Sequence, residues 1–119
     1  MNAQTSHIEL PYGLLELDAR GLVLRYAPAF EQNPQVKADD IMGHNFFNEV
    51  LPASEIKECQ SRFQRFMEQG QTIDKFTTTF TSEKGPVKVQ ILLAQILEKT
   101  KGKVERLALV RIMPEEGFA

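Results

Sequence analysis

Residues able to catalyse a reaction or bind a metal are scarce in this sequence. The chain has one cysteine, Cys59, and two histidines, His7 and His44. A single cysteine excludes an internal disulfide and a CxxC redox or zinc motif. The nucleotide-binding, hydrolase and metalloprotease strings GxGxxG, GxxxxGKS/T, GxSxG and HExxH do not occur. We therefore predict no catalytic residue, no metal site, no cofactor and no enzymatic activity.

Aromatic residues are the better candidates for a binding site. A small-molecule pocket is an apolar cleft with a few polar groups, and Tyr26 would be its one obvious polar group. The predicted ligand-binding residues are Tyr26, Phe30, Phe46, Phe47, Phe63 and Met67. The alternative is that these side chains fill the core and leave no room for a ligand.

A helix is predicted over residues 54–69, because apolar residues recur there every three or four positions. Ser54 can cap its first turn, and Gly70 follows its last. The apolar stripe consists of Ile56, Cys59, Phe63, Phe66 and Met67. We expect Cys59 to be buried on this stripe and chemically inert.

Strands are predicted on both sides of this helix. An Asp-x-x-Gly turn separates two short apolar stretches at residues 13–18 and 22–26, which predicts a β-hairpin. Alternation of apolar and polar residues predicts three more strands at 76–81, 87–93 and 106–113, with a charged loop at 98–103. Short helical turns fit between residues 27 and 49. The order predicts an α+β fold: a five-stranded antiparallel sheet with helices packed on one face.

The second face of this sheet has mixed character. Thr77, Thr79 and Thr81 lie together on one side of their strand, as a dimer surface or as a solvated face. In the next strand, Leu92 and Ile96 interrupt the alternation, which indicates cover on both faces or a bulge.

Length and composition describe one ordinary globular domain. The chain has 119 residues, of which 42% are hydrophobic and 25% charged, and a net charge of -2. This composition excludes a disordered chain, and the slightly negative net charge gives no sign of binding to nucleic acid or to an anionic membrane surface. No apolar run is long enough to span a bilayer and no secretory signal is visible, so we predict a cytoplasmic protein. We expect a leader at residues 1–11, the domain at 12–113 and a tail at 114–119.

Two segments resemble a known family. Residues 43–52 read GHNFFNEVLP, and residues 17–26 read LDARGLVLRY. Together with the element order, they resemble PAS domains, and in particular the photoactive yellow protein branch, whose pattern G-x-N-F-F-x-x-V-x-P matches the first segment. The resemblance covers about residues 12–113. It implies the PAS fold and a sensory or regulatory role.

The same resemblance implies that the family's photochemistry is missing. In the photoactive members, a cysteine just after the proline carries thioester-linked p-coumaric acid, and this position is Ala53 here. The family's buried glutamate corresponds to Phe30, and its threonine and arginine correspond to Pro34 and Val36. Only Tyr26 remains of the chromophore network. A buried phenolate needs hydrogen-bond donors, so we expect a non-photoactive member.

These observations lead to one hypothesis with two alternatives. We expect a stand-alone PAS domain that acts through a protein partner, forms a homodimer and responds to a small apolar ligand. The first alternative is a constitutive dimeric adaptor with a filled core. The second is a chromophore- or haem-binding photoreceptor or gas sensor, in which His44 would be the candidate haem ligand; we expect His44 to lie at the surface instead. Asn45 is expected to have a structural role.

Overall fold

The computed structural model describes residues 11–29, 38–51, 56–82 and 85–115. Residues 1–10 of the predicted leader and residues 116–119 of the predicted tail lie outside this description, as do Phe30, Pro34, Val36, Ala53 and the predicted helix cap Ser54. The elements in chain order are β1 (Gly13–Leu17), β2 (Val23–Pro28), α1 (Ala38–Ile41), the π-helical turn η2 (Phe46–Val50), α2 (Ile56–Gln69), β3 (Ile73–Ser82), β4 (Gly85–Thr100) and β5 (Lys103–Pro114).

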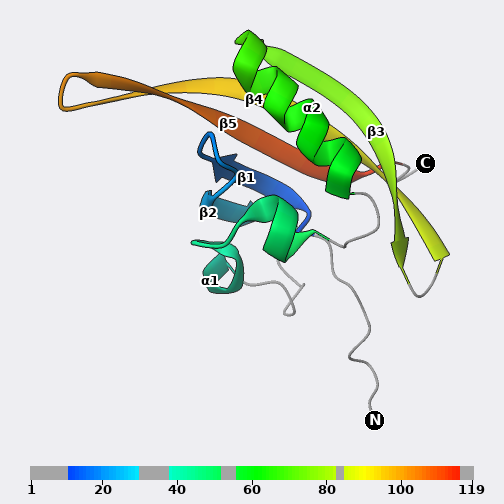
Figure 1. The fold of residues 1–119 in the computed structure, drawn as a ribbon. Helices are drawn as coiled ribbons and strands as arrows, with labels where there is room; N and C mark the ends of the chain where they lie inside the picture. Colours follow the sequence, from blue (N-terminus) through cyan, green and yellow to red (C-terminus); the bar gives the residue numbers. More distant parts are fainter. Residues whose placement is uncertain (1–10, 30–37, 52–55, 83–84, 116–119) are drawn as a thin grey trace.

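The five strands form one sheet in the order β2-β1-β5-β4-β3, and every neighbouring pair is antiparallel. Helix α2 lies across one face of this sheet, while η2 and α1 lie near β1 and β2 (Figure 1). The predicted α+β class and five-stranded antiparallel sheet are therefore confirmed. None of the helices in the described part of the chain has the length and apolar character needed to cross a membrane.

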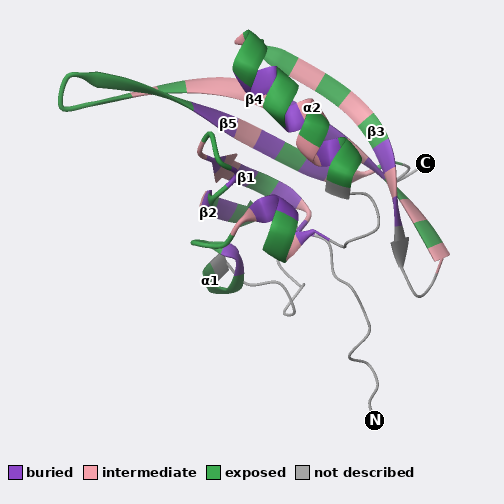
Figure 2. Ribbon diagram, in the orientation of Figure 1, coloured by how far each residue is buried: buried purple, intermediate pink, exposed green. Residues whose placement is uncertain are grey.

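The core lies between α2, η2 and the inner face of the sheet. Burial alternates along β1, where Leu15 and Leu17 are buried while Leu14 is exposed. Along α2, buried and exposed residues alternate with the helical period (Figure 2). The described members of its predicted stripe are all buried: Cys59, Phe63, Phe66 and Met67. The predicted helix and its core-facing side are confirmed.

The β4–β5 hairpin is longer than predicted. Residues 98–103 were expected to form a charged loop, but only Lys101 and Gly102 form the turn. Their φ angles are 52° and 81°, as a two-residue turn with both central residues left-handed requires. Pairing from Thr100↔Lys103 to Val89↔Pro114 is continuous, so no bulge interrupts β4 at Leu92 or Ile96. The loop prediction was wrong because an exposed hairpin end is as charged as a loop.

Polar contacts fix α2 on the sheet. The guanidinium of Arg62 on α2 donates to both carboxylate oxygens of Asp74 on β3, at 3.1 and 3.2 Å. Its carbon Cζ also lies 4.2 Å from the ring centroid of Phe76. Both side chains of the ion pair are partly shielded from water. The pair therefore helps to orient α2 on β3, while burial of apolar side chains supplies most of the free energy that holds the helix there.

Replacing Phe66 by alanine tests that apolar attachment. The ring is fully buried, at 0% exposure, so Phe66→Ala should lower the free energy of unfolding in urea by roughly 3 kcal/mol or more. The neighbouring Arg65→Ala is the matched control, because Arg65 is exposed on the same helix, and its effect should stay within about 0.5 kcal/mol. Equal effects of the two substitutions would contradict the assigned core.

Candidate functional site

The predicted site is an aromatic cluster between η2 and α2. The rings of Phe46 and Phe47 meet edge to face with centroids 5.1 Å apart, and the ring of Phe47 lies 5.0 Å from that of Phe63. Each of these side chains is at most 3% exposed, and Met67 is 8% exposed. Tyr26 belongs to the same core cluster. The structure thus brings together five of the six predicted residues, while Phe30 lies outside the described part.

Tyr26 already uses its hydroxyl proton within the fold. Its Oη donates to the backbone oxygen of Tyr12 at 2.8 Å, and burial raises the pKa of the Tyr26 phenol. Because a hydroxyl also has acceptor lone pairs, Tyr26 could still receive a hydrogen bond. It is therefore a neutral acceptor for a ligand rather than an available donor.

Asn45 holds η2 to the first hairpin. Its Oδ1 accepts from the backbone N–H groups of Phe47 and Asn48, at 3.0 and 3.1 Å. Its Nδ2 donates to the backbone oxygen of Arg20, at 3.0 Å. One side chain thus caps the turn that carries two core phenylalanines and ties it to the β1–β2 turn. The predicted structural role of Asn45 is confirmed.

Backbone contacts reinforce this attachment along the edge of β2. The N–H of Val23 donates to the oxygen of His44 at 3.0 Å, and the N–H of Gly43 donates to the oxygen of Val23 at 2.9 Å. Gly21 has a φ of 92°, and a Cβ on it would come within 3.0 Å of the Phe47 ring. The glycine therefore allows both the turn and the close approach of the aromatic cluster.

An exposed ion pair lies at the start of η2. Nδ1 of His44 is 2.7 Å from Oε1 of Glu49, and Oε2 of Glu49 accepts from the backbone N–H of Asn45 at 3.1 Å. These two hydrogen bonds lower the pKa of the Glu49 carboxyl below 4.5. The His44 side chain is 48% exposed, which confirms its predicted surface position. The described residues contain no group of three or more His, Cys, Asp or Glu placed to hold a metal ion.

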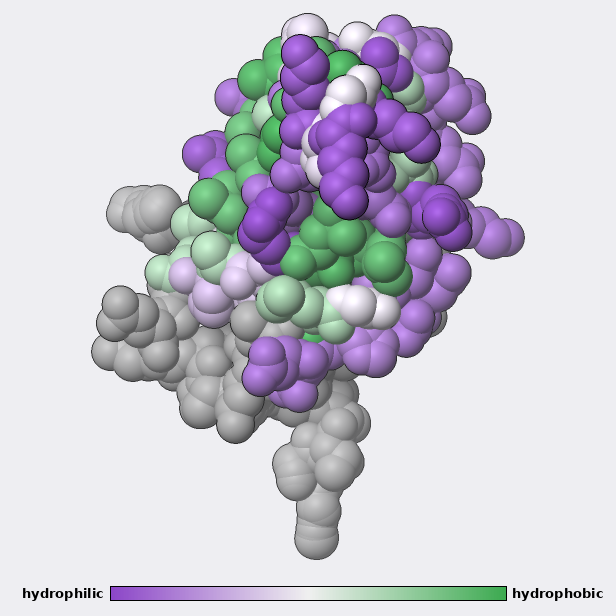
Figure 3. All heavy atoms as spheres, turned by 90° about the vertical axis from the view of Figure 1, so that its left-hand side faces the viewer, coloured by the Kyte–Doolittle hydropathy of each residue, from purple (hydrophilic) through white to green (hydrophobic). Residues whose placement is uncertain are grey.

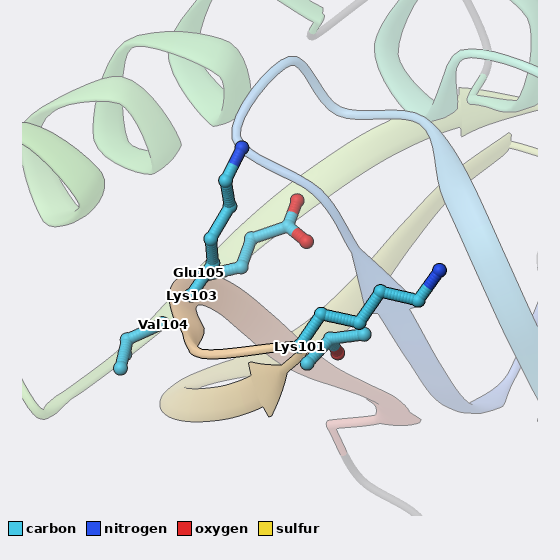
Figure 4. Close-up of a pocket in the computed structure, with 5 residues that line it drawn as sticks. Lys101, Lys103, Val104 and Glu105 are labelled. Atoms are coloured by element: carbon cyan, nitrogen blue, oxygen red, sulfur yellow. The ribbon is translucent and has the colours of Figure 1, made fainter.

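None of three hollows on the described surface is lined by more than one of the predicted site residues. One, of about 440 Å³, lies at the end of α2 and is lined by Met67 and Arg106 among others. A second, of about 340 Å³, is lined in part by Tyr26, Leu14 and Met42. The third, of about 460 Å³, lies at the tip of the β4–β5 hairpin, where Lys103 and Glu105 point one way and Val104 the other (Figure 4).

Arg106 is a residue of this region that the sequence did not suggest. Its Nη1 donates to the backbone oxygen of Met67 at 3.3 Å, so it satisfies a carbonyl at the end of α2. It comes from β5, far along the chain from that helix. No local pattern indicates such a contact, because it depends on how the strands and α2 are placed in space.

The Glu49 carboxyl predicts a loss of stability in acid. Its folded-state pKa is lowered, so its contribution is present above the unfolded pKa and is lost as the pH falls through the folded value. Glu49→Gln should therefore reduce the fall in melting temperature between about pH 6 and pH 3. Thermal unfolding across this range measures it, with Glu68→Gln on the exposed side of α2 as control. Parallel pH profiles for wild type and Glu49→Gln would exclude this role.

Comparison with known proteins assigns the chain to a family. No family model matches it. Photoactive yellow protein of Halochromatium salexigens is 32% identical over 89 residues, which are 75% of this chain and 71% of that protein. The homologue of Cereibacter sphaeroides is 34% identical over 82 residues, 69% of this chain and 66% of that one.

Solved structures agree on the fold. The photoactive yellow protein domain from the sensor histidine kinase Ppr of Rhodospirillum centenum is 26% identical, with a TM-score of 0.61, and the match covers 86% of this chain and 92% of that domain. The PAS domain of the RpfR quorum-sensing receptor of Cronobacter turicensis is 16% identical, with a TM-score of 0.55 and coverages of 87% and 94%. The chain is therefore a PAS-fold member of the photoactive yellow protein family.

Proposed function

We propose that this protein is a non-photoactive sensory or regulatory PAS domain that signals through a protein partner. The observation that carries the proposal is the double attachment of η2. This turn supplies Phe46 and Phe47 to the core, and Asn45 binds it to the β1–β2 turn. A change in core packing would therefore move a segment whose other side faces solvent.

Residues 12–113 would form the sensing domain, in the cytoplasm. A family relative that is a domain of a sensor histidine kinase supports the sensory role. The described residues offer no assigned pair of nucleophile and base, so binding rather than catalysis is the proposed activity. The partner would recognise the exposed side of η2 and α1.

The residues described do not fit the family's chromophore. The chain's single thiol is Cys59, whose side chain is 3% exposed within the core on α2. A thioester requires an accessible thiolate, and the Tyr26 proton is already donated to Tyr12. These contacts support a non-photoactive domain, together with the alanine at position 53.

Restoring the thiol tests this part of the proposal. Ala53→Cys, incubated with an activated thioester of p-coumaric acid, should gain the mass of one p-coumaroyl group, because it supplies a nucleophile at the family's attachment position. Wild type should gain none, since its only thiol is buried. Intact-mass spectrometry measures the adduct, and Ala53→Ser is the matched control. A visible absorption band in wild type purified from its native host would contradict the proposal.

A small apolar ligand in the aromatic cluster would be the signal. The cluster is apolar, as the residues of a ligand site are expected to be, and the Tyr26 hydroxyl could accept a hydrogen bond. The PAS domain of RpfR has been solved in complex with BDSF and with C12:0, so a domain of this fold can hold such molecules. A ligand would act by binding one packing of η2 more tightly than another.

A thermal-shift screen with saturating apolar compounds tests the ligand. A compound at about 100 times its dissociation constant should add roughly 2.7 kcal/mol to stability. Phe47→Leu should change this shift, because Phe47 contacts both Phe46 and Phe63, whereas Arg65→Ala on the outside of α2 should not. Stabilisation by no compound, with a persistent dimer, would instead favour a constitutive adaptor with a filled core. The ring contacts at about 5 Å favour that alternative.

A further inference from the structure

The β4–β5 hairpin extends beyond the rest of the sheet as a two-stranded arm. β1 pairs with β5 only as far as Ala108, and β3 pairs with β4 only as far as Ala94. Residues 97–106, here called the arm, pair only with each other, and all of them except Glu98 are exposed. Figure 1 shows the arm reaching past β1, β2 and α2. A ribbon of two strands is only marginally stable in water, so the stability of the domain does not explain the arm.

One face of the arm combines apolar and cationic side chains. Leu97 lies directly opposite Arg106, and the next pair on the same face is Lys99 with Val104. This is the face that α2 covers further along the sheet, because Arg106 donates to the backbone oxygen of Met67 on that helix. Beyond the end of α2, Leu97 is 59% and Val104 62% exposed. The two are diagonal neighbours on this face, so they form one small apolar patch in solvent.

Positive charge borders this apolar patch. Lys99 lies beside it on the same face, and Lys101 follows in the turn. The two acidic residues of the arm, Glu98 and Glu105, face each other on the opposite side. Glu68 lines the same hollow as the guanidinium of the arm, so the lysines carry the clearest excess of positive charge. Figure 3 looks onto the tip and shows hydrophilic side chains in front, with hydrophobic ones beside them.

The β4 edge of the arm also carries main-chain groups without a partner in the described part of the chain. The N–H of Gln95 donates to the oxygen of Thr72 at 2.9 Å, so the main-chain groups of Gln95 point away from β5. This direction alternates along a strand, and Leu97 and Lys99 therefore point their N–H and C=O groups to the same side. No described strand pairs with β4 there, because β3 pairs only as far as Ala94. Such an exposed edge can accept a further strand.

We propose that the arm binds an extended acidic segment of a partner protein as an added strand. Running antiparallel to β4, the segment exchanges main-chain hydrogen bonds with Leu97 and Lys99. Its side chain opposite Leu97 is apolar and packs on the exposed patch. Its side chains opposite Lys99 and beside Lys101 are carboxylates. This contact goes beyond the proposed recognition of η2 and α1, because it uses a different part of the surface.

A second copy of this chain fits the same edge poorly. Pairing two arms edge to edge would bring Lys99 and Lys101 of both copies together, and like charges that face each other across strands are unfavourable. Lysine on an exposed strand edge is also a common protection against such self-association. The lysines therefore disfavour a copy of the arm and favour an acidic strand.

A synthetic peptide tests the charge and shape of this site. The peptide reads Glu-Thr-Glu-Thr-Val-Thr, with capped ends and a fluorescent label, so that its glutamates and valine share the face of Leu97 and Lys99. Fluorescence anisotropy with the full chain, up to about 1 mM protein, should show saturable binding that weakens as salt is added. Lys99→Glu should weaken it at least about tenfold, because repulsion replaces attraction. Lys57→Glu is the matched control, since it makes the same charge change on exposed α2, and it should leave the affinity unchanged.

Modified peptides test whether the main chain is recognised. N-methylation of the glutamate and valine amides, which would donate to β4, should abolish binding. N-methylation of the threonine amides, which would point away from β4, should preserve it. Amide hydrogen exchange followed by NMR should slow at Leu97 and Lys99 when the unmodified peptide binds, because their N–H groups gain acceptors.

Each outcome decides the inference. Absence of binding below about 1 mM, or equal affinities of wild type and Lys99→Glu, would overturn it. Binding that survives N-methylation of the glutamate and valine amides would overturn the added strand. Circular dichroism checks that the variants fold. Failure of the proposed ligand response would leave peptide binding intact, and loss of peptide binding would leave the thermal shifts intact, so the two results are distinguishable.

Discussion

The antiparallel pairing of β1 with β5 is the contact on which the rest of this structure depends. It places Leu15 opposite Val110 and Leu17 opposite Ala108, so segments from opposite ends of the domain meet at the centre of the sheet. All four side chains are at most 1% exposed. Closing so long a stretch of chain costs conformational entropy, which burial of these side chains offsets. The pairing also leaves β2 as an edge strand, available to the segment that follows it.

That segment pairs with the first residue of this edge strand. Gly43 and His44 form backbone hydrogen bonds with Val23 on β2, and Asn45 ties η2 to the β1–β2 turn. An unpaired edge strand is open to pairing with other chains, so these bonds protect it. They also fix the direction in which Phe46 and Phe47 enter the cluster. The same few residues therefore cover the start of the edge and orient the aromatic side chains of the candidate ligand site.

The periodicity of apolar residues predicted which segments form helices and strands. It predicted less well how long these elements are and which residues they contact. The helical spacing of Cys59, Phe63 and Phe66 predicted α2, because a single face is buried there. The Lys101–Gly102 turn could not be predicted, because the strand residues beside it are exposed on both faces and so show no alternation of apolar and polar residues. Contacts such as that of Arg106 with Met67 depend on tertiary placement and have no local signature. Part of the candidate site could be predicted from the sequence, because aromatic residues at periodic apolar positions indicate the core. The hydrogen bond that the Tyr26 hydroxyl donates could not be predicted, because it depends on the tertiary structure.

The sheet itself is the strongest physical link between the core and its outer face. The guanidinium of Arg25 on β2 lies 2.9 Å from the Glu16 carboxylate and 3.8 Å from that of Glu98 on β4. It thus extends across β1 and β5, and Leu107 on β5 is only 1% exposed. Its side chain is 61% exposed, and exposed ion pairs contribute little energy. Continuous ladders from β2 through β1 and β5 to β4 are far stiffer. A displacement of η2 that bends β2 would therefore alter the twist of the neighbouring strands β1, β5 and β4.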